Sequence, residues 1–172
     1  MTVSIVTGAS RGIGAAVVMI SSLAALTGLP HEAAYCASKR ALEAAAETIA
    51  YEVDRFGVRV AVIEPGYTDA GLATSVWDPH MPEQTEYRAL VEHFRNYWDA
   101  DSVELEPREL VVGAVRDAIE SDTPRFRYAL GEMGPMIREG VRTQSEEQWA
   151  AFLKETMGMT WWSQGRDGGA RP

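Results

Sequence analysis

Three stretches decide the fold: VVMISS (17–22), an Ala-rich segment (33–56) and RVAVIEPG (59–66). The apolar run 17–20 predicts one strand, ending at Ser21-Ser22, and residues 58–63 predict another, ended by Pro65-Gly66. The middle segment is rich in Ala, Leu, Glu and Lys and is followed by Gly57, which predicts a long helix closed by a glycine. Strand, helix and strand in this order indicate parallel strands of an α/β protein.

The pattern continues on both sides of this unit. Upstream, VSIVT (3–7) predicts a strand and residues 8–14 a glycine-rich turn. Downstream, the sequence predicts a helical excursion over 71–99, a helix from Glu106-Pro107 to about Ser121 with proline at its first position, and a strand over 126–130. Ser145 to Gln148 resembles a capping box.

We expect three regions. Residues 1–131 form an α/β domain with a parallel sheet, 132–162 a helical extension and 163–172 a disordered tail.

Composition excludes several classes of protein. The 172 residues include 16 basic and 25 acidic side chains, a net charge of −9, which argues against a nucleic-acid partner. Cys36 is the single cysteine and the three histidines have no ligand-like spacing, so we expect neither a disulfide nor a metal site. No apolar run is long enough to span a membrane, and no secretory signal is visible. A cytoplasmic location is therefore the expectation.

The glycine turn TGASRGIG (7–14) follows a predicted strand directly. Glycines permit close backbone approach to a pyrophosphate, whose charge the exposed N–H groups bind. An ordinary glycine-rich turn is the alternative. Arg11 is suited to the 2′-phosphate of NADP, and a solvated loop arginine is the other interpretation.

Tyr35 and Lys39 stand four residues apart on the predicted helix, so they share one face. A phenol is a weak acid at neutral pH, and a nearby ammonium stabilises the phenolate. Ser22, at the end of the preceding strand, can hydrogen-bond a substrate oxygen. A tyrosine and a lysine at this spacing occur on many helices by chance. The strand-end serine before them and Pro65-Gly66 after the next strand make the combination specific.

On TGASRGIG, VVMISS, YCASK (35–39) and RVAVIEPG, the sequence resembles the classical short-chain dehydrogenase/reductase family. The resemblance implies a doubly wound nucleotide-binding fold with three catalytic residues. The fold class expected on this basis is α/β, a Rossmann-like parallel sheet over 1–131 that is truncated to its first strand and its C-terminal half, with a helical C-terminal tail. Tyr35 would be the acid/base, Lys39 would activate it and hold the nicotinamide ribose, and Ser22 would orient the substrate carbonyl. The residues implied for cofactor binding are Gly8, Ser10, Arg11, Gly12, Ile13, Gly14, Tyr35, Lys39, Pro65, Gly66 and Thr68.

The chain departs from the family in one large respect. Only Ala15 and Ala16 separate the glycine turn from the serine strand, where the family has three strands with their helices. Three strand–helix units of about 30 residues each amount to roughly 90 residues that the family has and this chain lacks. Either the natural protein has a segment that this chain lacks, or the chain is a deletion product with weakened cofactor binding. In addition, the family's threonine after Pro-Gly is Ala70 here, with Thr68 two residues earlier.

Two further groups of side chains have competing interpretations. Aromatic residues in the 71–99 excursion lie where family members carry a substrate lid, although core or subunit packing explains such spacing more simply. They are Trp77, Tyr87, Phe94, Tyr97 and Trp98. The acidic residues Glu104, Glu106 and Glu109 are expected to form a solvated helix start.

The sequence therefore predicts an NAD(P)-dependent oxidoreductase acting on a small carbonyl or alcohol of hydrophobic character. NADP is the expected cofactor and NAD the alternative. We expect no nucleic-acid or membrane partner and leave a homo-oligomer open. The competing hypothesis is a non-catalytic, truncated family member that acts through protein contacts.

Overall fold

The structure, a computed structural model, describes residues 15–69, 86–97 and 105–165. The chain divides into two compact units. The first contains the described residues of 1–68 and 106–139, and the second contains those of 69–105 and 140–172.

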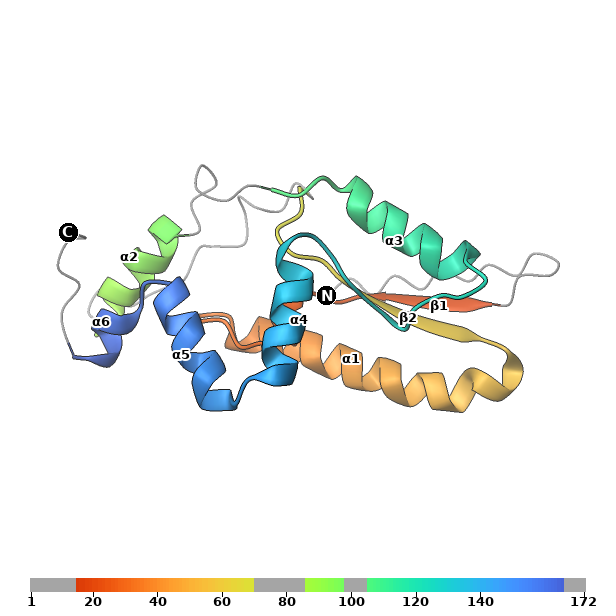
Figure 1. Ribbon diagram of the computed structural model, residues 1–172, viewed down its shortest axis with the longest axis horizontal. Coiled ribbons are helices and arrows are strands. Elements are labelled where there is room, and N and C mark those ends of the chain that lie inside the picture. The colour runs from red at the N-terminus through yellow and green to blue at the C-terminus, as the bar shows by residue number, and fades with distance from the viewer. Residues whose placement is uncertain (1–14, 70–85, 98–104, 166–172) are drawn as a thin grey trace. The chain divides into compact units, whose positions relative to one another are not determined.

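The first unit is built on a parallel sheet of three strands in the order β1-β2-β3 (Figure 1). They are β1 (Ala16–Ile20), β2 (Arg59–Glu64) and β3 (Arg127–Ala129). Val18 pairs with Ala61 and Ile63 with Tyr128, which defines the register. These strands confirm three of the four predicted ones and the parallel α/β class. The fourth, VSIVT at 3–7, lies outside the described residues.

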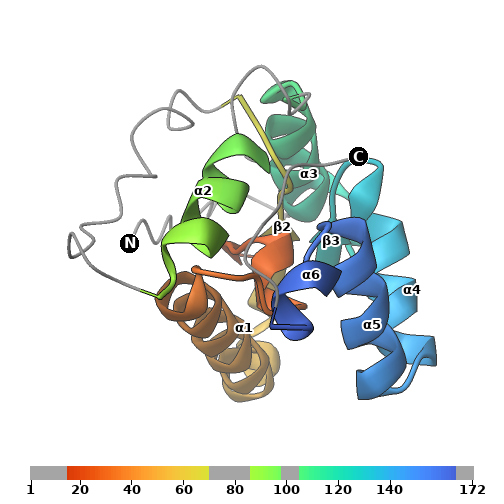
Figure 2. The ribbon, with the colours of Figure 1, turned by 90° about the vertical axis from the view of Figure 1, so that its left-hand side faces the viewer.

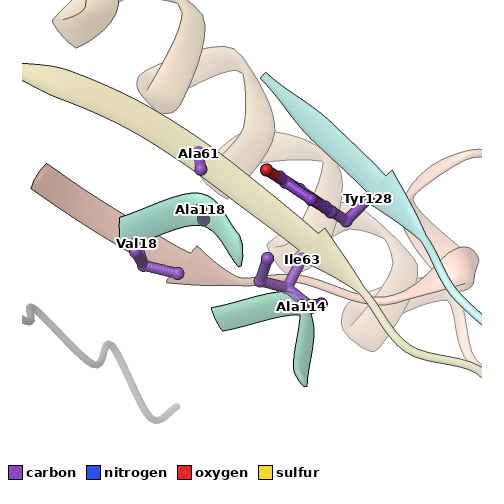
Figure 3. Close-up of a cluster of buried hydrophobic side chains, with 6 residues drawn as sticks. All are labelled: Val18, Ala61, Ile63, Ala114, Ala118 and Tyr128. Atoms are coloured by element: carbon purple, nitrogen blue, oxygen red, sulfur yellow. The ribbon is translucent and has the colours of Figure 1, made fainter. Parts of the chain in front are cut away.

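Helices α1 (Ala33–Val53) and α3 (Glu109–Glu120) cover opposite faces of this sheet (Figure 2). Alternate strand residues divide between the two faces, as the period of a strand requires. Val18 packs with the cluster that contains Ala114 and Ala118 of α3 (Figure 3). The neighbouring Met19 packs with the cluster that contains Ala46 of α1. A continuous apolar run such as VVMI is therefore buried on both faces.

The two connections between strands have opposite hands. The chain passes from β1 to β2 and from β2 to β3 in the same direction across the sheet. The helices that lead into β2 and β3 nevertheless lie on opposite faces. Parallel crossovers that advance in one direction over opposite faces must differ in hand, so one of them departs from the usual right-handed rule.

The ends of α1 and α3 differ slightly from prediction. The α-helix of α1 ends at Val53, and a 3-10 turn, η2 (Asp54–Phe56), completes the predicted segment. Gly57 follows with φ 66°, the left-handed conformation expected at a helix end. Helix α3 begins at Glu109 rather than at Pro107. The carbonyl of Pro107 accepts from Leu110 N in a preceding turn, so the proline lies just before the helix instead of at its first position.

The second unit is helical, with α2 (Arg88–Tyr97), α5 (Glu146–Thr156) and α6 (Thr160–Ser163). Helix α4 (Met133–Thr143) begins in the first unit and continues into the second. The Ser145–Gln148 capping box is present at the start of α5, which confirms that prediction.

Aromatic contacts hold α2 and α6 together within the second unit. The His93 ring lies 5.8 Å from that of Trp161, and its Nε2 is 2.7 Å from the Met157 carbonyl oxygen. Phe94 is fully buried, as the packing interpretation of the aromatic excursion requires. Trp77 and Trp98 lie outside the described residues.

Substitution of two glycines that have free space around them is expected to change stability in opposite directions. At both Gly57 and Gly113 an added Cβ would meet nothing within 4 Å, so only the backbone conformation differs. Gly57→Ala forces alanine into the left-handed region and is expected to lower the free energy of unfolding by about 1 kcal/mol. Gly113→Ala, inside α3, is expected to raise it by up to about 1 kcal/mol. Urea denaturation measures both, and equal effects would contradict the assignment of the α1 terminus.

Candidate active site

The candidate site lies where β1 and β2 end. Ser21 N donates to Ile63 O at 2.7 Å, and Leu23 N donates to Pro65 O at 3.0 Å. The segments that follow the two strands therefore run side by side beyond the sheet. In open α/β sheets, the carboxyl ends of the strands are where ligands bind.

Ser22 begins a 3-10 turn, η1 (Leu23–Ala25), that follows β1. Its backbone is extended, and its Oγ accepts from Ala24 N at 3.2 Å. A hydroxyl that accepts one hydrogen bond still has a proton to donate. The half-buried Ser22 thus has the chemistry to bind a carbonyl oxygen while its own position is fixed by the turn it caps.

Tyr35 and Lys39 lie on successive turns at the beginning of α1. The Lys39 ammonium is 5.6 Å from the centroid of the Tyr35 ring. Tyr35 is 44% exposed. The structure brings the two residues together on one helix face, as their spacing predicts.

A backbone contact anchors the lysine. Lys39 Nζ donates to Ile20 O at 3.1 Å. Because Ser21 N points toward β2 and a trans peptide directs its N–H and C=O oppositely, this carbonyl faces away from β2. Burial lowers the pKa of Lys39 below its usual value. The contact ties the start of α1 to the last residue of β1, one residue before the serines.

The Pro65–Thr68 segment lies beside the serine turn. An added Cβ on Gly66 would come within 3.3 Å of Leu23 Cδ1 and 3.6 Å of Glu106 Oε2. Thr68 forms a parallel bridge with Glu106, whose N–H donates to Tyr67 O at 2.6 Å. Side chains of the protein itself thus surround Gly66.

Glu106 corrects an expectation. Its Oε1 accepts from Glu132 N at 3.2 Å, and its buried Oε2 has no hydrogen-bond partner among the described residues. An added Cβ on Gly131, whose φ is 70°, would overlap this carboxylate. Glu106 is therefore part of the packing around Gly66 and not a solvated helix start. Glu109 does lie exposed in the first turn of α3, while Glu104 is outside the described residues.

Sequence reasoning missed a buried ionic cluster beneath these segments. Glu64, the last residue of β2, is fully buried and lies 3.2 Å from Arg127 Nε and 3.1 Å from Arg138 Nη1. Glu43 of α1 lies 3.2 Å from the same Arg127 Nε, and Glu47 binds the other end of that guanidinium. The sequence contains one signal of this cluster, since Glu64 ends an otherwise apolar strand. Its partners Arg127 and Arg138 are more than 60 residues away in the sequence, so no local pattern could identify them.

The cluster changes the ionisation of Glu64. Burial raises its pKa to about 7, with a further increase from the nearby Glu43 carboxylate. The Arg138 and Arg127 guanidinium groups oppose this rise but do not cancel it.

The glycine-turn residues Gly8, Ser10, Arg11, Gly12, Ile13 and Gly14 lie outside the described residues. Within the part of the chain that the structure describes, no group of three or more His, Cys, Asp or Glu side chains is arranged to hold a metal ion. None of the described helices has the length and apolar character needed to cross a bilayer.

Comparison with known proteins matches residues 15–80 to the short chain dehydrogenase family. Human retinol dehydrogenase 16 is 31% identical over 111 residues, which is 56% of this chain and 34% of that protein. The uncharacterized oxidoreductase YbbO of Escherichia coli K12 is 33% identical over 112 residues, 65% of this chain and 38% of that protein. The chain thus spans well under half the length of these relatives.

The fold has a counterpart among solved structures. A short chain dehydrogenase from Burkholderia cenocepacia, in complex with NADP, superposes with a TM-score of 0.58 at 23% identity. The match covers 81% of this chain and 48% of that one. At this identity the likeness establishes the Rossmann-like fold alone.

The raised pKa of Glu64 predicts a pH-dependent stability. The folded protein binds the Glu64 proton more tightly than the unfolded chain, so stability is highest below the unfolded pKa and declines as pH rises through about 7. The full contribution is up to about 3 kcal/mol. Glu64→Gln removes the titration. The free energy of unfolding of the wild type, relative to this variant, is expected to fall by up to that amount between about pH 5 and pH 8.

Urea titrations at a series of pH values measure this difference. Glu47→Gln is the matched control, because Glu47 also binds Arg127 but its side chain is 52% exposed. It should keep the wild-type pH dependence. Parallel pH profiles for the wild type and Glu64→Gln would refute the assignment.

Proposed function

We propose an activity on the premise that the chain belongs to the short-chain dehydrogenase/reductase family. The proposed function is NAD(P)-dependent oxidoreduction of a small carbonyl or alcohol. The observation that carries it is the Lys39 ammonium beside the Tyr35 ring, at the end of β1 from which Ser22 projects into its turn. These residues provide an acid/base, a cation that stabilises its ionised form, and a hydroxyl for the substrate oxygen.

In the oxidation direction, Ser22 would hold the substrate hydroxyl and the Tyr35 phenolate would accept its proton. The hydrogen on the carbinol carbon would leave with its electron pair as hydride, for which a bound NAD(P)⁺ would supply the acceptor, and the carbonyl would form. In the reduction direction, Tyr35 would return a proton to the carbonyl oxygen. Lys39 would place its positive charge beside the phenol oxygen during the proton transfer, since its ammonium lies 5.6 Å from the centroid of the Tyr35 ring.

The described residues fit the nicotinamide half of a dinucleotide. Tyr35 and Lys39 offer a hydroxyl and an ammonium of the kind that bind ribose hydroxyls, and Pro65-Gly66 borders the same strand ends. When bound, the dinucleotide supplies a two-electron carrier. The pyrophosphate half would fall to Gly8, Gly12 and Gly14, with Arg11 as the residue suited to NADP. The NADP complex of the Burkholderia protein supports this choice over NAD.

The substrate class is proposed to be a hydrophobic alcohol or its carbonyl. Retinol dehydrogenase 16 is among the relatives, and its name specifies such an alcohol.

Tyr35→Phe tests the proposal. It removes only the hydroxyl, so turnover is expected to fall by about 10²–10⁴-fold, while NADPH binding weakens by no more than about tenfold because a single hydrogen bond to the ribose is lost. Tyr51→Phe is the matched control, because Tyr51 lies on the same helix with 84% of its side chain exposed. It should retain wild-type turnover. Retinol and cyclohexanol serve as substrates with NADP⁺ or NAD⁺, and absorbance of the reduced nicotinamide gives the rate.

Equal rates for the wild type and Tyr35→Phe would refute the assigned role. NADPH fluorescence with the purified chain tests the cofactor separately. Absence of binding by a chain that melts cooperatively would refute the enzyme proposal and favour a non-catalytic family member.

A further inference from the structure

We propose that Glu43 is a positioning residue of the candidate active site, which acts through Ser21 to hold the serine turn against α1. The serine turn comprises residues 21–25, which follow β1. This inference rests on the proposed function, because it assigns to Glu43 the task of placing Ser22 relative to Tyr35 and Lys39.

The contact that carries it is buried on both sides. Ser21 Oγ donates to Glu43 Oε1 at 2.8 Å, and the two residues are only 3% and 6% exposed. A hydrogen bond to a carboxylate is stronger than one between neutral groups, and water does not compete for it here. Ser21 is therefore held in one orientation, and Ser22 is the next residue of the chain.

Successive turns of α1 bind successive residues at the end of β1. Lys39 binds the carbonyl of Ile20, and Glu43, one turn later, binds the side chain of Ser21. Two attachment points fix both the distance between the helix and the strand and the rotation of the helix about its axis. Tyr35, one turn before Lys39, is placed by the same two contacts.

Glu43 is itself held in place from the sheet. Its Oε2 lies 3.2 Å from Arg127 Nε of β3, and Arg127 also contacts the buried Glu64 of β2. Arg138 of α4 binds Oε2 of Glu64, while Arg127 contacts Oε1 of the same carboxylate. The carboxylate that orients Ser21 is thus attached to two strands and does not depend on its own helix alone.

The energetics favour positioning over stabilisation. Burying carboxylates costs desolvation energy that their ion pairs often fail to recover, so apolar residues of similar size would serve stability as well or better. An apolar residue at position 43 would not bind Ser21. The buried carboxylate of Glu43 therefore supplies a directional hydrogen bond to the serine turn, which an apolar side chain could not form.

Amide hydrogen exchange of the protein without ligand tests the inference. Ala24 N donates to Ser22 Oγ and Ala25 N to Ser22 O, so both amides report the order of the serine turn. Ser21→Ala deletes the bond to Glu43 while Glu43 keeps Arg127. We expect exchange at Ala24 and Ala25 to rise about tenfold, and exchange at the core amide of Val62 to change less than about twofold.

Variants at Glu43 separate orientation from charge. Glu43→Ala should reproduce the increase at these two amides, and its combination with Ser21→Ala should add little there, since both variants delete the Ser21–Glu43 bond. Glu43→Ala also deletes the pairing with Arg127, which Ser21→Ala leaves in place. Glu43→Gln keeps an oxygen that accepts from Ser21 and should stay within about threefold of the wild type. Glu47→Gln removes a carboxylate from the same Arg127 without touching Ser21, and it should leave these amides within about twofold.

Turnover gives the second readout. Ser21→Ala is expected to lower kcat about tenfold with KM changed less than about twofold, because misplacement of Ser22 affects the reacting geometry more than binding. Unchanged exchange in Ser21→Ala, or an equal rise in Glu47→Gln, would overturn the inference. If the wild type shows no turnover, the proposed function fails, while the exchange data still decide whether Glu43 positions the serine turn.

Discussion

Parallel pairing of β1 with β2 requires the chain to leave the carboxyl end of one strand and return to the amino end of the next, and α1 makes that return. The first turns of α1 must therefore lie near the end of β1, and the last turns near the start of β2. The crossover therefore brings Lys39 to the end of β1, where it binds the carbonyl of Ile20, two residues before Ser22. Tyr35 lies beside Lys39 on the same helix face.

The ionic cluster beneath the site joins elements that the crossover alone leaves free to shift. Glu43 comes from α1, Glu64 from β2, Arg127 from β3 and Arg138 from α4. The cluster holds the serine turn through the hydrogen bond from Ser21 to Glu43, which is charged and directional. The contact between Leu23 and Gly66, in the segments that follow β1 and β2, is instead apolar packing. Apolar packing tolerates small displacements, whereas hydrogen bonds to carboxylates do not.

The match to the short chain dehydrogenase family covers residues 15–80. It includes the candidate residues Ser22, Tyr35 and Lys39, and the structure describes the whole stretch from Ser21 to Thr68. In the described residues, β1 pairs with β2 alone, and the Ile20 carbonyl that faces the other way is bound by Lys39. The same ammonium is thus both a structural contact of β1 and the proposed partner of Tyr35.

Local patterns in the sequence predicted strands over 17–20 and 58–63, which the structure has at 16–20 and 59–64. They also predicted helix α1 with its terminal Gly57, the Ser145 capping box and the shared face of Tyr35 and Lys39. Each depends on residues within a few positions of one another, so periodicity and capping rules suffice. The tertiary structure alone decided that α3 lies opposite α1, that Glu106 is packed against Gly66, and that Glu43 binds Ser21 and Arg127. These contacts join residues far apart in the chain, and they depend on strand register and helix rotation, which no local pattern specifies.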